Sequence, residues 1–182
     1  MLVDASVVGR VFWRGALASI APDADVGTAL GTLEERDFVR REAVSRITGD
    51  QQFAFKHAVI REVAYERLPR AARRERHAAV AAFLQERTGS VAQANEAIAD
   101  HWQEAGEERR AVECLLVAAD QAARGWAKGH ALTLYSTALG LLPEDDPVRP
   151  EVRRRQVVAH QAYQHLVMKD VEDAERPSAD GG

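Results

Sequence analysis

The hydrophobic period of the chain changes abruptly at one histidine, and this change limits the folds that the chain can adopt. Phe53–Lys56 has the period of two that is typical of a strand, with both phenylalanines on one side. From His57 onward the apolar residues recur at helical spacing, on a helix that is rich in arginine. Backbone N–H groups at a helix start are unpaired and carry partial positive charge. His57 is therefore either a residue that faces a phosphate or a hydrogen-bonded structural residue.

The residues before this junction predict helices followed by a small β-ribbon. Helical spacing predicts helices at Leu2–Val11, Gly15–Ile20 and Val26–Asp37. Shorter apolar runs, with a turn at residues 48–51, predict strands at Phe38–Glu42, Val44–Ile47 and Phe53–Lys56. This order of elements is that of a winged-helix-like module, which we expect over residues 1–70.

The chain after His57 is predicted to be helical almost to its end. The first helix carries its apolar residues at helical spacing, at Val59, Ile60, Val63, Ala64 and Leu68. Breaks at proline and glycine separate five more helices, at Ala72–Gln85, Ala92–Ala105, Glu108–Arg124, Lys128–Leu142 and Val148–Val171. The polar tail, residues 172–182, is predicted to be disordered because it has too little apolar surface to bury.

The later helices show a weak repeat. Helix pairs begin near Ala72, Glu108 and Val148, spacings of about 36 and 40 residues that lie near the ~34-residue tetratricopeptide unit. The best match is Ala131–Pro143, with small residues where helices approach, Tyr135 as the bulky buried residue, and a proline just past the helix end. We therefore expect a mainly α protein with a tetratricopeptide-like superhelix over residues 71–171. A generic helical bundle is the alternative.

The charge of the chain is uneven. The formal net charge is −4, yet Arg36–Arg76 holds eleven Lys/Arg and six Asp/Glu. This basic surface, residues 36–76, supports an alternative function as a DNA-binding transcriptional regulator, because arginines on a helix-turn-helix-like module contact phosphates. The predicted helix Val26–Asp37 is acidic and poorly suited to reading bases, so a solvated or docking arginine face is favoured over DNA binding.

No pattern in the sequence predicts catalysis or metal binding. Walker-type phosphate loops, GxGxxG, CxxC, HExxH and EF-hand patterns are all absent. The six histidines are scattered, and His160 and His165 are five residues apart, the wrong spacing for two ligands on one helix face. We expect no catalytic residue, no metal site and no enzyme activity.

Composition also limits the compartment. The single cysteine, Cys114, excludes an internal disulfide and falls on a predicted apolar helix face, where a buried, inert thiol is expected. No apolar run approaches the ~18–20 residues that a membrane span needs, and no secretion signal is recognisable at the N-terminus. We expect a cytoplasmic protein that has no membrane partner.

Three stretches resemble the region after the ATPase core of bacterial STAND regulators (signal-transduction ATPases with numerous domains), above all multidomain proteins with cyclase-like or LuxR-type domains. The stretches are Ala5–Phe12 (ASVVGRVF), Leu33–Val39 (LEERDFV) and Phe53–Tyr65 (FAFKHAVIREVAY). The last is the most specific. The downstream helices resemble the tetratricopeptide-like superhelix of the same proteins, so the likeness covers roughly Leu2–Pro143.

The resemblance implies a regulatory role. In STAND proteins the winged-helix module packs on the nucleotide-binding domain and holds it closed around ADP, and a histidine of a Met-His-Asp motif contacts the phosphate. His57 is the position that looks like this histidine, with Lys56 and Ala58 in place of its neighbours. We therefore expect His57 to sense ADP or ATP held by a separate nucleotide-binding core, which this chain lacks. The chain would be a fragment, a truncated gene product or a partner of such a core, and its repeats would bind a protein or an inducer.

Overall fold

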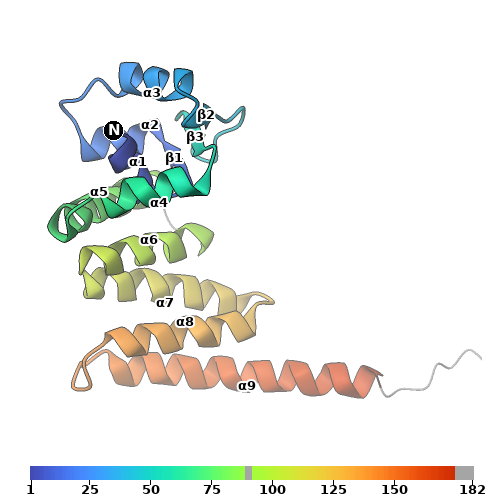
Figure 1. The fold of residues 1–182 in the computed structure, drawn as a ribbon. Helices are drawn as coiled ribbons and strands as arrows, with labels where there is room; N and C mark the ends of the chain where they lie inside the picture. Colours follow the sequence, from blue (N-terminus) through green and yellow to red (C-terminus); the bar gives the residue numbers. More distant parts are fainter. Residues whose placement is uncertain (89–91, 175–182) are drawn as a thin grey trace, which may run out of the picture. The chain divides into compact units, whose positions relative to one another are not determined.

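The computed structural model describes residues 1–88 and 92–174. Within them, the chain forms nine helices and a three-stranded antiparallel sheet, which confirms a mainly α protein with a small β element (Figure 1). The chain divides into two compact units, the first over Met1–Ala111 and the second from Val112 onward. None of the helices in the described ranges combines the length and apolar character that a membrane span requires.

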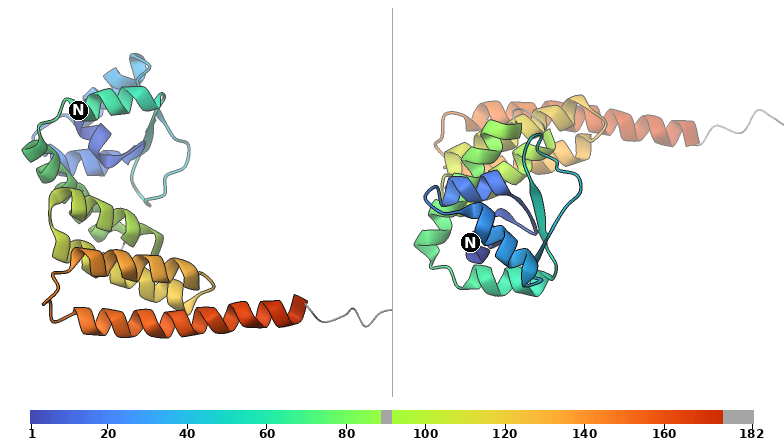
Figure 2. Two further views of the ribbon diagram at one scale, coloured as in Figure 1. Left: turned by 60° about the horizontal axis from the view of Figure 1, so that its bottom comes forward. Right: turned by 90° about the horizontal axis from the view of Figure 1, so that it is seen from above.

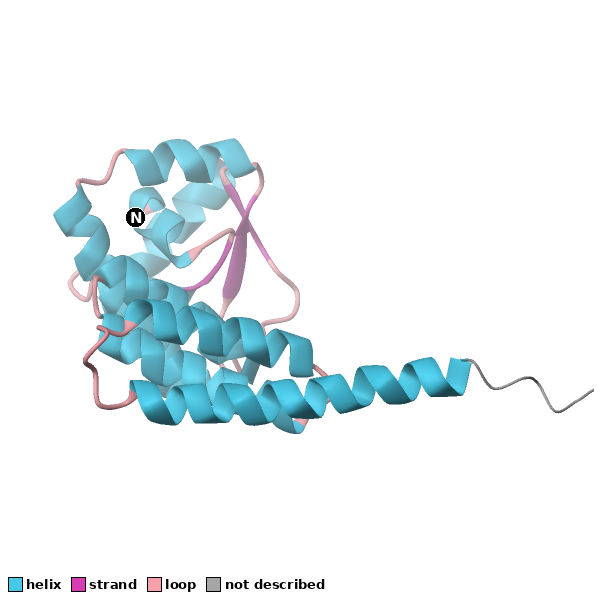
Figure 3. Cartoon of the chain, turned by 90° about the horizontal axis from the view of Figure 1, so that it is seen from below, coloured by secondary structure: helices cyan, strands magenta, loops and turns pink. Residues whose placement is uncertain are grey.

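The first unit contains the sheet and the helices around it. Its elements are α1 (Leu2–Val8), β1 (Val11–Trp13), α2 (Arg14–Ile20), α3 (Val26–Glu35), β2 (Val39–Arg41), β3 (Gln52–Phe55), α4 (Ala58–Glu66), α5 (Arg70–Thr88) and α6 (Ala92–Ala105). The strand order is β1-β3-β2, and the sheet lies to one side of these helices (Figures 2 and 3). Most predicted helices lie near their expected positions, whereas the observed strands depart more from the predicted ones.

The prediction of one helix over Leu2–Val11 is wrong at its C-terminal end. Helix α1 ends at Val8, because Gly9 adopts φ 142°, and Val11–Trp13 forms strand β1. This strand pairs antiparallel with β3, and the Phe12 and Phe53 rings stack with their centroids 5.8 Å apart. The partner strand lies about forty residues further along the chain, so no local pattern reports the pairing.

The predicted strand Val44–Ile47 is also wrong, because this segment has no ladder partner. Side chains satisfy its backbone instead: the Arg46 N–H donates to Gln52 Oε1 at 2.9 Å, and the Ile47 N–H donates to Ser45 Oγ at 3.2 Å. Only Ile47 of this segment is buried, and Val44 is 79% exposed. The segment is a loop held by these two hydrogen bonds, with the Ile47 side chain in the core.

The core of the first unit extends beyond the predicted boundary after residue 70. Helix α5 packs on α1 and α2, and α6 packs on α5. Val80, Ala81 and Leu84 of α5 are buried, as are Ile98 and Trp102 of α6. These two helices were expected among the repeats, but their apolar faces complete the core of the first unit.

The second unit is built from α-helices in the residues described there. Helix α7 (Glu108–Arg124) begins in the first unit and continues into the second, followed by α8 (Lys128–Leu141) and α9 (Arg149–Ala174). Helices α8 and α9 pack together antiparallel, and α9 continues past the N-terminal end of α8 (Figure 1). The predicted burial of Cys114 and Tyr135 is confirmed. Of the predicted disordered tail, residues 172–174 belong to α9, and residues 175–182 lie outside the described part of the chain.

Candidate functional site

His57 lies at the junction of β3 and α4, as the sequence predicts. It is the N-cap residue of α4, with an extended backbone (φ −129°, ψ 134°), and its side chain makes no capping hydrogen bond. The neighbouring Lys56 pairs with Asp37, which leaves Lys56 occupied. The imidazole of His57 is exposed and has no hydrogen-bond partner among the described residues. The side chain therefore remains accessible to a binding partner.

Two valines on α4 extend this accessible surface. Val59 and Val63 are 64% and 48% exposed and lie one helical turn apart, on the same side of the helix. Both belong to the apolar pattern that predicts the helix, but the buried side of α4 is formed by Ala64 and by contacts to α1. We call His57, Val59 and Val63 the α4 face. It is a small apolar surface that starts at an unpaired histidine.

The opposite side of α4 is held firmly. The Arg61 guanidinium donates from Nε to the Ser6 carbonyl at 3.0 Å, and the Arg73 guanidinium lies 4.4 Å from the centre of the Tyr65 ring. The Tyr65 hydroxyl lies 3.0 Å from His77 Nε2 on α5. These contacts fix the orientation of α4, and therefore of the α4 face, relative to α1 and α5.

Tyr65 is the first member of a chain of three polar side chains. His77 Nδ1 lies 2.8 Å from His101 Nδ1, so the chain joins α4, α5 and α6. Burial lowers the pKa of His77, and burial together with the nearby His77 lowers the pKa of His101 to about 4. Because both pKa values are lowered, the two rings are neutral near neutral pH. Only one proton fits between the two Nδ1 atoms, so one ring donates to the other.

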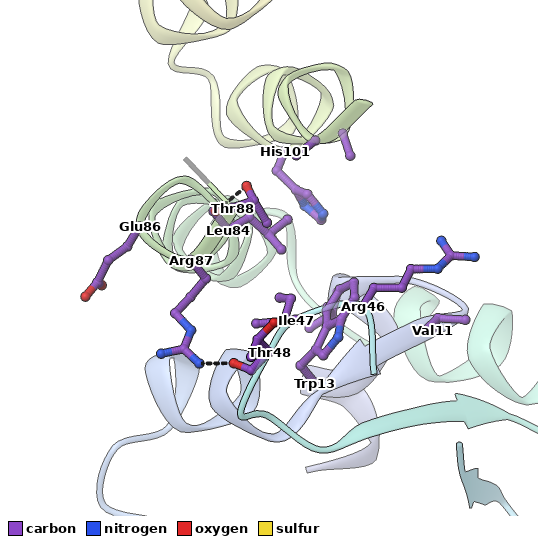
Figure 4. A pocket seen from close by; sticks show the side chains of 13 residues that line it. Val11, Trp13, Arg46, Ile47, Thr48, Leu84, Glu86, Arg87, Thr88 and His101 are labelled. Carbon is purple, nitrogen blue, oxygen red and sulfur yellow. Dashed lines mark hydrogen bonds between the residues drawn. The ribbon is translucent and has the colours of Figure 1, made fainter. Parts of the chain in front are cut away.

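The first unit also has a cavity of about 930 Å³, which no residue of α4 lines. It is lined by α1, β1, the loop before β3, the end of α5, and α6 (Figure 4). Val8, Ile47 and Leu84 supply buried apolar surface. His101 points from α6 toward Ile47 and Trp13, which places one end of the polar chain at the cavity wall. The volume lies within the ~300–1,000 Å³ that is typical of small-molecule sites.

The polar groups of this cavity differ in how well they are satisfied. The Arg87 Nη2 donates to the Thr48 carbonyl at 3.1 Å, and the Glu86 side chain points away from the other lining residues. The Arg46 side chain is exposed and has no ion-pair partner among the described residues. The buried Nε1 of Trp13 has no hydrogen-bond partner among the described residues. The exposed Arg46 side chain is therefore a free donor of the cavity lining, whereas the Trp13 Nε1 is sealed within the protein.

A second cavity, of about 460 Å³, lies in the second unit, and most of the charged side chains that line it are paired with one another. The Tyr135 hydroxyl donates to Asp120 at 2.6 Å, and Arg155 donates to Asp120 and Glu151, both at 2.9 Å. Burial, followed by the bond to Asp120, raises the pKa of Tyr135. This network ties α7, α8 and α9 together.

Most Lys and Arg side chains of the basic surface 36–76 make hydrogen bonds or ion pairs within the first unit. Seven of its eleven Lys/Arg bond to carboxylates or backbone carbonyls within the first unit: Arg40, Arg41, Lys56, Arg61, Arg73, Arg74 and Arg76. An arginine that already holds a carbonyl or carboxylate is less available to a DNA phosphate. Most of the positively charged side chains of this surface are thus already bonded to groups of the first unit itself.

The cavity and the histidine pair have no local signal in the sequence. His77 and His101 stand on different helices, and the cavity draws on five separate segments. No group of three or more metal-binding side chains comes together in residues 1–88 and 92–174. Compared with protein-family models, curated proteins and solved structures, the chain matches none of them.

Proposed function

We propose that the chain is a non-catalytic regulatory and interaction module of a STAND-type ATPase signalling protein, acting in the cytoplasm. The first unit, as a winged-helix-like module, would dock on a nucleotide-binding core through the α4 face. The second unit, with α7, α8 and α9 as tetratricopeptide-like helices, would bind a protein partner or an inducer. Nucleotide would be held by the core, with His57 sensing its phosphate.

The observation that carries this proposal is the α4 face itself. His57 makes no structural hydrogen bond, and Val59 and Val63 lie exposed beside it on a helix that is fixed from its other side. Exposed apolar side chains on a rigid element favour protein contact. A histidine at a helix start is also suited to an anion, because the unpaired N–H groups there attract negative charge.

The second unit supports the interaction role. Ala131 and Ala138 of α8 are fully buried, as small residues must be where helices approach closely. Tyr135 between them is also buried. Helical hairpins of this kind stack into extended surfaces that bind other chains.

The proposal is tested by calorimetry of ADP and ATP with three samples: the chain alone, a separately expressed STAND nucleotide-binding core alone, and their mixture. We expect tighter ADP binding only in the mixture. Val59→Asp should weaken docking by at least tenfold, because it places a charge in an apolar contact. The matched control is Val44→Asp, which makes the same change on an exposed valine outside the α4 face.

His57→Ala separates nucleotide sensing from docking. We expect the variant to dock like the parent but to lose the effect on ADP affinity. ADP affinity that is the same with the core alone and with the mixture would overturn the proposal. Equal loss of docking in Val59→Asp and Val44→Asp would assign the effect to charge in general rather than to the α4 face.

A further inference from the structure

We propose that two copies of this chain associate through the C-terminal part of α9, as an antiparallel pair related by a two-fold axis. The surface involved, which we call the C-terminal patch, consists of Trp126, Tyr163, Leu166, Val167 and Met168. All five residues belong to the second unit, so the association does not use the α4 face. The proposed function requires no second copy of the chain, and this inference goes beyond it.

The apolar side of α9 that packs on α8 continues past the end of α8. Ala159 is buried on this side, and Tyr163 and Leu166 follow it by four and seven residues, which places them on the same side. The Tyr163 ring lies against the first turn of α8, where a Cβ at Gly129 would be 3.5 Å from a ring carbon. Helix α8 thus begins opposite Tyr163, and α9 continues beyond it for about three more turns, to Ala174 (Figure 1).

Large apolar side chains are exposed at this end of the second unit. Val167 and Met168 are 41% and 60% exposed, and Tyr163 is 38% exposed. Trp126, in the turn that leads into α8, is 90% exposed. Grouped exposed apolar side chains mark interaction surfaces, and tryptophan and tyrosine are the residues that most often anchor a protein interface. The C-terminal patch therefore has the composition of an interface.

The charges of the sequence favour a second copy as the partner. Residues 170–175 include four acids and no Lys or Arg, whereas residues 121–143 include Arg124 and Lys128 and no acid. Residue 170 lies seven residues, about 10 Å, past Tyr163 along α9, so the acidic end of the helix lies beyond the basic turn of its own chain. In an antiparallel pair, the end of each α9 returns to the turn before α8 of the other copy, where Arg124 is exposed. Opposite charges then meet across the interface.

The helix dipole adds to this argument. Acids near the C-terminus of a helix are unfavourable on their own, because that end of the helix carries partial negative charge. A basic neighbour from a second copy would offset this. A two-fold axis brings the same surface of both copies together, so each copy supplies one acidic helix end and one basic turn. The patch is small, and we therefore expect a weak dimer with a dissociation constant in the micromolar range.

The test is sedimentation velocity of the full chain at a series of micromolar concentrations. We expect a monomer–dimer equilibrium whose dissociation constant rises with salt, because salt screens exposed charges. Val167→Asp should raise the dissociation constant at least tenfold, because it places a charge in an apolar contact. Trp126→Ala should have an effect of similar size, because it removes an aromatic anchor. Arg124→Gln should weaken the dimer several-fold at low salt and little at high salt.

The matched control is Val157→Asp, the same change on a valine of the same helix that is 54% exposed. Val157 is two residues before the buried Ala159 and so lies on the other side of α9. Val59→Asp, on the α4 face, is a second control. Circular dichroism spectra and thermal midpoints like those of the parent would show that each variant is folded.

The outcomes separate this interface from the alternatives. A weaker dimer in Val167→Asp and Trp126→Ala, with the parental dissociation constant in both controls, supports the proposal. A parent that is monomeric at every concentration overturns it and leaves the patch to a different partner. Equal weakening in Val157→Asp and Val167→Asp, or loss of the dimer in Val59→Asp alone, overturns it as well. None of these results depends on nucleotide, so they are distinct from the test of docking on a nucleotide-binding core.

Discussion

At the scale of single residues, Gly15 is a position where an added side chain would clash with its neighbours. Its N–H donates to both carboxylate oxygens of Asp50 at 3.1 Å, and this links the start of α2 to the loop before β3. A Cβ at this position would lie 2.5 Å from Asp50 Oδ2 and 2.7 Å from Cε2 of Phe83. Gly15→Ala should therefore destabilise the first unit by about 1–3 kcal/mol, through overpacking. Urea unfolding followed by circular dichroism measures the change.

Gly31 supplies the control for this prediction. It lies inside α3, and a Cβ there would meet no atom within 4 Å. Gly31→Ala should stabilise the helix by about 0.5–1 kcal/mol, because alanine loses less backbone entropy than glycine on folding. A stabilising effect of Gly15→Ala, like that expected of Gly31→Ala, would contradict the close packing around Gly15.

Tyr135 is a second residue whose contribution to the free energy of unfolding can be measured, through its hydroxyl group. It donates to Asp120, which also accepts from Arg155, so this half-buried bond connects α8 to α7. Tyr135→Phe should lower the free energy of unfolding by about 1.5–3 kcal/mol, the range for a hydrogen bond to a charged group. Tyr135→Ala should cost about 3–5 kcal/mol, because it also leaves a cavity. Chemical denaturation of the full chain measures both losses.

Tyr163→Phe is the matched control for Tyr135→Phe. Tyr163 lies on α9 in the same unit and is 38% exposed. Its substitution removes the same hydroxyl without breaking a buried contact, so the expected change is within about 0.5 kcal/mol. Equal effects of the two substitutions would mean that the Tyr135–Asp120 bond contributes no net stability.

At the scale of elements, the chain Tyr65–His77–His101 makes the packing of α4, α5 and α6 sensitive to acid. Burial lowers the pKa of His77, and the charges around it are Glu104, Arg61 and Arg73. Burial, His77 and Arg61 also lower the pKa of His101, to about 4, while the Val8 carbonyl opposes the shift. In the unfolded chain a histidine titrates near pH ~6.5.

The sign of the pH dependence follows from this difference. Between about pH 6.5 and about pH 4 the unfolded state takes up a proton that the folded state refuses, so stability falls as the pH falls. For His101 the loss is on the order of 2 kcal/mol between about pH 7.5 and about pH 5. Urea unfolding of the parent at both pH values should show this loss.

Two variants make this prediction specific. His101→Leu removes the titrating group, so its unfolding free energy should depend less on pH in this window, whatever its absolute stability. His160→Gln changes an exposed histidine of α9 and should retain the parental dependence. His101 would be excluded as the source if the parent and His101→Leu lost equal stability between the two pH values.

The same scale explains which elements could be predicted from the sequence. The helices from Ala58 to Leu141 lie close to their predicted positions, because their period is local and strong. Strand β1 was missed because three residues carry no period, and its partner β3 lies far along the chain. The residues Val44–Ile47 have strand-forming composition, but side-chain hydrogen bonds hold them as a loop.

The candidate sites divide in the same way. The position of His57 follows from a change of period between adjacent residues, so it could be predicted. The exposure of Val59 and Val63 could not, because their spacing is that of an amphipathic helix and only packing decides which side is buried. The cavity depends on five segments that meet only in the folded unit, and no single segment reports it.

At the scale of the whole molecule, the division into units differs from the predicted boundary after residue 70. The first unit extends to Ala111, because α5 and α6 supply buried side chains to it. Leu17 of α2 and Val80 of α5 are both buried in this unit, where the two helices pack together. Ending the chain after residue 70 would expose the faces of α1 and α2 that α5 covers.

This arrangement predicts different behaviour for two fragments. Residues 1–111 should unfold cooperatively in urea, because the fragment retains the helices that close its core. Residues 1–70 should show no cooperative transition, because removing α5 leaves the apolar side of α2 without its cover and a domain of this size has little core to spare. Circular dichroism across a urea titration distinguishes the two results. A cooperative transition in residues 1–70, with a midpoint close to that of residues 1–111, would mean that α5 and α6 are attached to the first unit without stabilising it.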